Sequence, residues 1–147
     1  MGGMQDGFER LWTPHRLAYI EQLQQPHESE CPFCEAPGRS DEDGLIVARG
    51  THVYAVMNLY PYNAGHMLIC ANRHVADLTE LTISERNEIT EFSAKAMAVL
   101  RKVSKCAGFN LGMNQGAISG AGVAEHIHQH VVPRWSGDAN FMPIIGQ

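Results

Sequence analysis

The sequence contains no uninterrupted apolar run that approaches the ~20 residues of a membrane-spanning helix. Positive charge is also scarce, because eleven Lys and Arg stand against sixteen Asp and Glu and give a formal net charge of −5. A broad basic face for duplex nucleic acid is therefore not expected. Residues 1–10 have no apolar stretch behind a basic region, so we expect no secretory leader there. We expect neither a membrane protein nor a nucleic acid binder.

Cysteine is too rare and too unevenly placed for a disulfide scaffold. Of the four cysteines, Cys31 and Cys34 are close neighbours, whereas Cys70 and Cys106 stand alone in apolar segments. This usage favours a reduced, cytoplasmic setting with a metal site. By itself, the pair Cys31 and Cys34 is equally compatible with a redox-active, a structural or an incidental role.

The chain is long enough for one domain with its own hydrophobic core. It has 147 residues, of which 44% are hydrophobic and 18% are charged, and this composition is too apolar for disorder. We therefore expect a single domain over residues 1–147.

The order of helical and extended patterns indicates an α+β fold with a mostly antiparallel sheet. A short helix is expected near the N-terminus, with Thr13 as its cap and Pro14 at its first position. β-branched and apolar residues predict a hairpin and three further strands, the last of which Pro133 closes. These expected elements cover residues 13–23 (helix) and residues 45–49, 51–57, 66–71, 109–114 and 125–132 (strands).

One long helix is expected over residues 84–105. Thr82 and Glu85 have the spacing of a capping box at its start, and Gly108 is a natural stop after its end. Apolar residues at spacings of three and four predict one buried face, formed by Ile89, Phe92, Ala96, Val99 and Val103.

Three histidines alternate within the last expected strand. His126, His128 and His130 project to one side of an extended segment, while Ile127 and Val131 project to the other. Such a row of imidazoles can bind a metal ion or perform nucleophilic and acid–base chemistry. The alternative is the polar surface of an ordinary amphipathic strand.

A glycine-rich loop precedes the histidine row. Gly116, Gly120 and Gly122 lie within residues 115–122, where backbone amides can approach an anion closely. The combination of the loop and the histidine row favours a functional site over a polar strand surface.

The pattern His126-Ile127-His128-Gln129-His130-Val131-Val132 resembles the signature of the histidine triad family of nucleotide-binding hydrolases and transferases. Polar Gln129 departs from it, because this slot is usually apolar. Three other segments are also similar to segments of the family: Asn58-Leu59-Tyr60-Pro61, Gly65-His66-Met67-Leu68-Ile69 and Asn114-Gln115-Gly116.

Further segments resemble one branch of this family, the bacterial diadenosine tetraphosphate phosphorylases. These segments are Asn58-Leu59-Tyr60-Pro61-Tyr62-Asn63, Ala124-Glu125-His126, Val131-Val132-Pro133-Arg134-Trp135 and Gly137-Asp138-Ala139-Asn140-Phe141. The resemblance implies a dimerising fold of the histidine triad type. It divides the expected domain into a helical extension (1–30), a core (31–135) and a tail (136–147).

The resemblance also implies a mechanism. His128 would attack the α-phosphorus of a nucleotide and form a covalent nucleotidyl-histidine, and His130 would contact the phosphate oxygens. The other residues that it implies for substrate binding are Asn58 at the ribose, and Asn114, Gly120, Ala121 and Gly122 at the phosphates. Trp135, just after the triad strand, is expected to line a second nucleotide pocket or to form a subunit contact.

One departure from the family concerns the leaving group. Many relatives carry a polar side chain three or four residues before the triad, where this sequence has Val123 and Gly122. Either Ser119 or backbone amides substitute, or contact with the leaving group is weaker. Hydrolysis by water and phosphorolysis by inorganic phosphate therefore both stay open.

A zinc site is implied beside the catalytic one. The two-residue spacing lets Cys31 and Cys34 reach one ion, and the resemblance adds His74 and His126 as the remaining ligands. A closed set of two cysteines and two histidines implies a structural ion.

The expected function is that of a diadenosine tetraphosphate phosphorylase, with a small-molecule nucleotide and inorganic phosphate as substrates and with a second copy of the chain as partner. The alternatives are an adenosine phosphoramidate hydrolase and a zinc-stabilised nucleotide-binding module without turnover.

Overall fold

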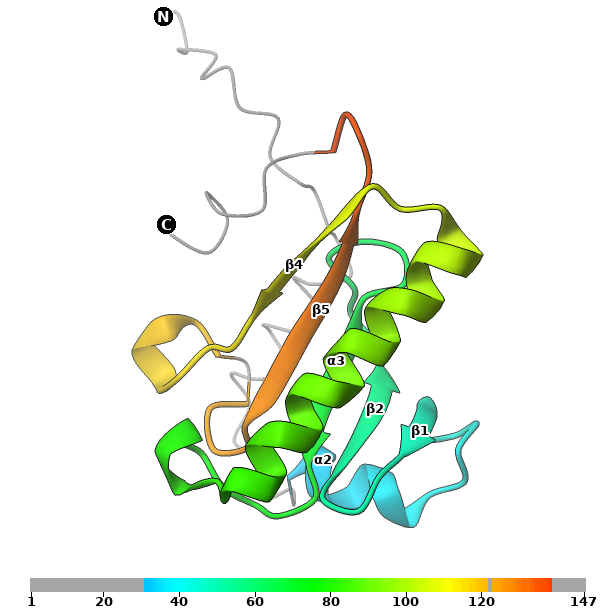
Figure 1. The fold of residues 1–147 in the computed structure, drawn as a ribbon. Coiled ribbons are helices and arrows are strands. Elements are labelled where there is room, and N and C mark those ends of the chain that lie inside the picture. The colour runs from blue at the N-terminus through cyan, green and yellow to red at the C-terminus, as the bar shows by residue number, and fades with distance from the viewer. Residues whose placement is uncertain (1–30, 122, 139–147) are drawn as a thin grey trace, which may run out of the picture.

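The computed structural model describes residues 31–121 and 123–138, and the short helix expected over residues 13–23 lies outside them (Figure 1). The described chain forms one antiparallel sheet in the order β1-β2-β3-β5-β4. Its strands are β1 (Ile46–Arg49), β2 (Val53–Met57), β3 (Met67–Ala71), β4 (Gly108–Gly112) and β5 (His128–Arg134). Its helical segments are α2 (Pro32–Glu35), α3 (Ile83–Ser104) and the 3₁₀ turns η1 (Ala36–Gly38), η2 (Leu78–Glu80) and η3 (Ala117–Ser119). The predicted α+β class and antiparallel sheet are confirmed.

The central strands bring the histidine row next to a fully buried strand. β3 is buried along its whole length, as its apolar sequence predicts for a strand covered on both faces. It pairs with β2 on one side and with β5 on the other, where Cys70 faces His128 and Leu68 faces His130. The predicted hairpin is present as β1 and β2.

The two faces of the sheet bury two different clusters, because successive side chains of a strand alternate. The first face, which we call the helix face, lies under α3 (Figure 1). The opposite face, which we call the site face, carries a smaller cluster against which Phe33 of α2 packs. The helix face includes Val53, Ala55, Ile69, Ile89, Ala96, Leu100, Ile127 and Val131, and the site face includes Ile46, Tyr54, Val56, Leu68 and Cys70.

The start of α3 matches the prediction. Thr82 Oγ1 accepts a hydrogen bond from the Glu85 amide at 3.2 Å, and Glu85 Oε2 accepts one from the Thr82 amide at 2.7 Å. The capping box is therefore confirmed.

The predicted end and buried face of α3 need correction. The helix ends at Ser104 because Lys105 adopts a left-handed conformation, with φ of 55°, and Gly108 instead begins β4. Val99 and Val103 are exposed, since the helical repeat of 3.6 residues carries the buried stripe along the set Glu85, Ile89, Ser93, Ala96 and Leu100.

The last strand also differs from the prediction. β5 begins at His128 and continues through Pro133 to Arg134, whereas closure at Pro133 was expected. Pro133 is tolerated because its carbonyl accepts a hydrogen bond from Asn63 and so faces away from β4, and its ring nitrogen faces the same side. β3 pairs with β5 only as far as Val131, so the missing N–H removes no ladder bond there.

Among the described residues, no helix combines the length and the apolar character needed to cross a membrane.

Candidate active site and metal centre

Two groups of side chains meet at one end of the site face. The first is a cluster of two cysteines and two histidines, and the second is a cavity lined by His128 and His130. Both groups draw on segments that are far apart in the chain and that the sheet order brings together.

The cluster contains all four predicted metal ligands. Cys31 and Cys34 flank the start of α2, His74 follows β3, and His126 precedes β5. Cys31 Sγ lies 3.3 Å from His126 Nδ1, Cys34 Sγ lies 3.3 Å from His74 Nδ1, and the two Nδ1 atoms are 3.3 Å apart. All four ligand atoms lie within 4.8 Å of one another.

These distances fit a tetrahedral zinc ion. With Zn–S of about 2.3 Å and Zn–N of about 2.05 Å, tetrahedral angles place S and N about 3.6 Å apart and N and N about 3.3 Å apart. Two thiolates and two imidazoles are also the ligand types that zinc prefers in structural sites. The cluster can therefore hold a zinc ion with a closed coordination shell.

The orientation of His126 is set from outside the cluster. Its Nε2 lies 2.7 Å from the Ala71 carbonyl oxygen, which can only accept, so Nε2 carries the hydrogen. Nδ1 is then free of hydrogen and faces the cysteines, as a metal ligand requires. The buried ring also packs edge-on against Phe33, with 5.6 Å between the ring centroids. Its burial lowers the pKa of His126 below the ordinary value.

The same residue orients His128 through its backbone. The carbonyl oxygen of His126 accepts a hydrogen bond from His128 Nδ1 at 2.8 Å. The neutral ring therefore keeps the lone pair on Nε2, which is the nucleophilic nitrogen of this tautomer. Burial lowers the pKa of His128, which favours the neutral ring. Phe33 packs on this ring as well, with 4.8 Å between the ring centroids.

His130 stands at the end of a chain of ring nitrogens. The amide of Tyr62 donates to His66 Nδ1 at 3.0 Å, so His66 carries its hydrogen on Nε2. That Nε2 lies 2.9 Å from His130 Nδ1 and donates to it. In the neutral ring of His130 the hydrogen then lies on Nε2. His130 can therefore donate a hydrogen bond, whereas His128 presents a lone pair.

A cavity of about 430 Å³ contains most of the predicted substrate residues. Its apolar walls come from α2, from the loop before β1 and from β2 and β3. Its polar groups come from β5, from the loops that follow β2 and β4 and from the loop before β1. The predicted residues that line it are Asn58, Asn114, Gly120, Ala121, His128 and His130.

Two predicted substrate residues are not placed there. Trp135 does not line this cavity, and its indole nitrogen instead donates to the Ser104 carbonyl at the end of α3. Gly122 lies outside the described residues.

The segment before the triad matches the departure noted in the sequence. Val123 lines the cavity. Ser119 does not line it, and its hydroxyl donates to the Gly116 carbonyl at 2.6 Å. Among the described residues, Asn114 and the backbone of Gly120 and Ala121 therefore supply the polar groups on this side of the cavity.

Much of the apolar lining was not predicted. In the sequence, these side chains have the pattern of ordinary core residues, and only Phe33, between two cysteines, carries a local signal. The unpredicted lining includes Pro32, Phe33, Ala36, Leu45, Val56, Leu59 and Leu68, with Arg39 and Asp43 at the loop before β1.

Comparison with known proteins agrees with this geometry. A family model described as "HIT domain" matches residues 39–137. A protein of Mycobacterium tuberculosis named AP-4-A phosphorylase is 49% identical over 98% of this chain and 77% of its own length. A zinc-bound histidine triad family protein from Mycobacterium smegmatis has a TM-score of 0.67 and 24% identity, over 76% of this chain and 81% of its own. A HIT family protein from Bacillus anthracis has a TM-score of 0.64 and 26% identity, over 74% and 76%. The chain therefore belongs to the HIT domain family.

Proposed function

We propose that this chain is a nucleotidyl transferase that cleaves diadenosine tetraphosphate, with inorganic phosphate as the second substrate. The observation that carries the proposal is the geometry of His128, whose Nδ1 is bound by the His126 carbonyl while its ring lines a cavity of nucleotide size. The name of the M. tuberculosis relative, at 49% identity, supports the choice of substrate and reaction.

The first step forms a covalent intermediate. His128 Nε2 attacks the α-phosphorus, a nitrogen–phosphorus bond forms, and the bond from phosphorus to the bridging oxygen breaks. ATP leaves as an anion with that oxygen, and AMP stays on the ring. The hydrogen on Nδ1 stays on the ring and is donated to the His126 carbonyl, which stabilises the positive charge that the ring acquires.

The second step releases the nucleotide. An oxygen of inorganic phosphate attacks the same phosphorus, the nitrogen–phosphorus bond breaks, and ADP leaves with the neutral ring restored. The net reaction converts diadenosine tetraphosphate and phosphate into ATP and ADP. Water in place of phosphate gives AMP, which is the hydrolytic alternative.

Charge on the transferred phosphoryl group is held by donors around the cavity. We assign the Nε2 hydrogen of His130 to one non-bridging oxygen, because the chain through Tyr62 and His66 leaves the hydrogen on that nitrogen. Asn114 and the backbone of Gly120 and Ala121 are assigned to the remaining phosphates.

The nucleoside is assigned to the apolar half of the cavity. Phe33, Val56 and Leu68 offer a surface on which a purine ring can pack. Asn58 is assigned to the ribose hydroxyls, and its side chain is already held by the Tyr60 amide and by His66.

We propose that zinc, held by Cys31, Cys34, His74 and His126, has a structural role. When bound, the ion cross-links α2 to the segments that precede and follow the central strands. His126 would then serve both sites, with its ring at the metal and its carbonyl at His128.

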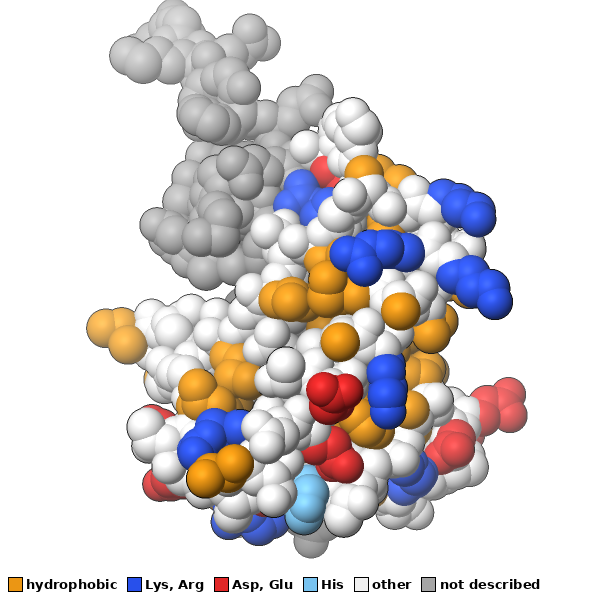
Figure 2. Space-filling view, in the orientation of Figure 1, with side chains coloured by type: hydrophobic (Ala, Val, Ile, Leu, Met, Phe, Trp, Pro, Cys, Tyr) orange, Lys and Arg blue, Asp and Glu red, His pale blue; other side chains and the backbone are white. Residues whose placement is uncertain are grey.

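A homodimer is also part of the proposal. The face of the molecule that carries α3 exposes hydrophobic side chains (Figure 2), including Val103 at 69% and Leu111 at 46% exposure. Among the described residues β4 pairs only with β5, so it presents an open edge next to these side chains. Light scattering on the purified protein tests this, and a monomer mass would contradict it.

Product analysis tests the proposed reaction. The protein is incubated with diadenosine tetraphosphate, with and without inorganic phosphate, beside H128A. ADP that appears only with phosphate is the expected result, whereas ATP and AMP in water alone would indicate a hydrolase. Turnover of adenosine phosphoramidate but of no dinucleotide would favour the phosphoramidate hydrolase. Equal inactivity of wild type and H128A on every nucleotide would favour the binding module.

A further inference from the structure

The two histidines of the metal cluster are held in different ways. His126 is buried, and its second nitrogen donates to the Ala71 carbonyl. His74 is exposed, and in the described part of the chain its ring makes hydrogen-bonding contacts only with Cys34 and His126 of the cluster itself. The position of His74 before metal binding must therefore come from its backbone.

One side of His74 is fixed by the core. Val75 is buried, and its carbonyl accepts a hydrogen bond from the Ile127 amide at 2.7 Å. This bond ties the residue after His74 to the residue after His126.

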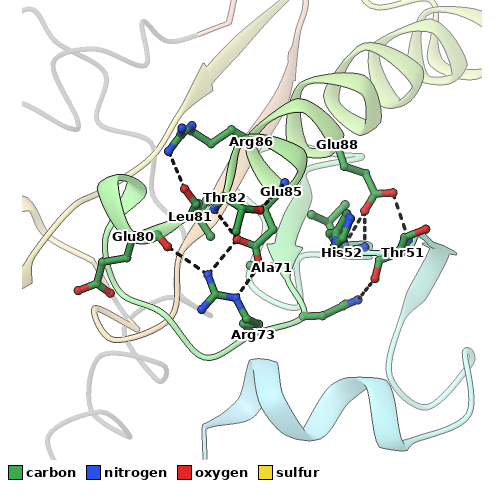
Figure 3. Close-up of polar contacts among 12 residues, drawn as sticks. Thr51, His52, Ala71, Arg73, Glu80, Leu81, Thr82, Glu85, Arg86 and Glu88 are labelled. Carbon is green, nitrogen blue, oxygen red and sulfur yellow. Dashed lines mark hydrogen bonds and ion pairs between the residues drawn. The ribbon is translucent and has the colours of Figure 1, made fainter.

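The other side of His74 is fixed by Arg73. Its guanidinium makes two bonds to the Glu85 carboxylate, from Nε at 2.6 Å and from Nη2 at 2.9 Å. Nη2 also donates to the Glu80 carbonyl at 3.1 Å. Figure 3 shows the Arg73 side chain extending from the connection after β3 toward Glu85 and the segment that leads into α3. A paired contact of this kind fixes direction as well as distance.

Glu85 is itself buried and held by several hydrogen bonds. Its side chain is only 5% exposed, and its carboxylate also closes the capping box with the Thr82 amide. The hydrogen bond from Arg73 lowers the pKa of Glu85 to about 2, so the ion pair is present at neutral pH. The residue before His74 is therefore anchored to the rigid first turn of α3.

We propose that Arg73 is a positioning residue for the metal centre, which holds His74 at its ligating position through the ion pair with Glu85. The inference rests on the proposal that the four side chains bind zinc, and it does not depend on nucleotide turnover. Partners of metal ligands that set ligand orientation typically change metal affinity by about 10- to 100-fold when they are removed.

The test is a zinc competition titration against a chromogenic chelator, at a temperature well below unfolding of every variant. R73Q is expected to lower zinc affinity about 10- to 100-fold relative to wild type. R73K, which keeps the charge but not the two-point geometry, is expected to fall between them. E85Q, which retains a residue suited to the capping box, is expected to weaken zinc binding as R73K does.

Arg86 provides a matched control. It lies in the same first turns of α3, and its guanidinium donates to the Leu81 carbonyl rather than to the segment that holds His74. R86Q removes the same charge, and its zinc affinity is expected to stay within about twofold of wild type.

Unfolding temperatures in excess chelator separate positioning from a general structural role. If R73Q binds zinc within twofold of wild type and only lowers the unfolding temperature of the metal-free protein, the positioning role is overturned. Equal loss of zinc affinity in R73Q and R86Q overturns it as well. If wild type itself takes no zinc, the metal centre is wrong and this inference with it, and that result is distinguishable because it appears before any variant is compared.

Discussion

The helix face and the site face of the same sheet are built by different rules. The helix face buries one stripe of α3 against alternate residues of neighbouring strands, and its contacts are mainly apolar, with Glu85 and Ser93 as polar members of the stripe. The site face carries histidine and aromatic rings, the side chains of the metal cluster and a cavity, drawn from segments between residues 31 and 130. The difference teaches that packing of α3 stabilises one face of the sheet, whereas the residues of the site gather on the other face, where the proposed zinc ion adds stability of its own. β3 and β5 contribute to both faces through alternation.

Loss of the nucleophile should produce the largest effect on turnover. It should not change the stability that the helix face provides. H128A is expected to lower turnover of diadenosine tetraphosphate on the order of 10⁴-fold or more, because no other group forms the covalent intermediate. Nucleotide binding and the unfolding temperature should stay near those of wild type. Steady-state kinetics and calorimetric binding measure this, with H52A, at the hairpin turn outside the cavity, as control.

Metal removal should show how far the metal centre on the site face contributes to the stability of the whole domain. Chelation is expected to lower the unfolding temperature by about 10 °C or more, since metal-binding energy adds to folding energy. Activity should fall too, because the His126 ring and the carbonyl that holds His128 belong to one residue. C34S should behave like the chelated wild type and respond no further to chelator. An unchanged unfolding temperature after verified zinc loss would contradict the account.

A substitution that removes a buried side chain on the helix face should lower stability and leave the site unchanged. L100A removes a side chain that is 6% exposed and is expected to cost about 2–5 kcal/mol of unfolding free energy. Zinc affinity and the KM for nucleotide should change less than twofold. Denaturant unfolding and kinetics below the transition measure both. A large change in KM at preserved folding would show that the faces are coupled.

Substitution of Glu85 has the smallest expected effect. This residue belongs to the buried stripe of α3 and pairs with Arg73, the neighbour of the metal ligand His74. Arg73 lowers the pKa of this carboxyl to about 2 in the folded protein, against about 4.3 for an unperturbed Glu. Its stabilising contribution is therefore complete above about pH 4.3 and is lost as the pH falls toward 2. E85Q is expected to lose about 2 kcal/mol at neutral pH and to show a flatter decline between pH 4.3 and 2. Parallel pH profiles of the two proteins would contradict the role of the ion pair.

The helix face was largely predictable from the sequence, because its rules are local. The capping box at Thr82 and the hairpin of β1 and β2 follow from spacing and residue type, and the structure confirms both. Two predictions for α3 were wrong. The predicted buried stripe was shifted by one residue at Val99 and Val103, which are exposed, and Lys105 rather than Gly108 caps the end of the helix.

The site face was predictable only where a motif marked it. The two-residue spacing of Cys31 and Cys34 marked a candidate metal site, but the spacing of 40 residues between Cys34 and His74 carries no geometric signal. His74 and His126 were expected as ligands only through the family resemblance. His126 was expected inside the last strand, yet it lies before β5, where its Nδ1 faces Cys31 and Cys34. Phe33 and Leu68 line the cavity but look like core residues in the sequence, because burial against a ligand and burial against protein favour the same side chains.

Trapping the covalent intermediate tests the central claim most directly. The protein is mixed with diadenosine tetraphosphate in the absence of phosphate, quenched, digested and mapped by mass spectrometry. The account predicts AMP on His128, formed with an equal amount of free ATP, and its release as ADP when phosphate is added. Turnover with no adduct, or an adduct on another residue, would contradict it.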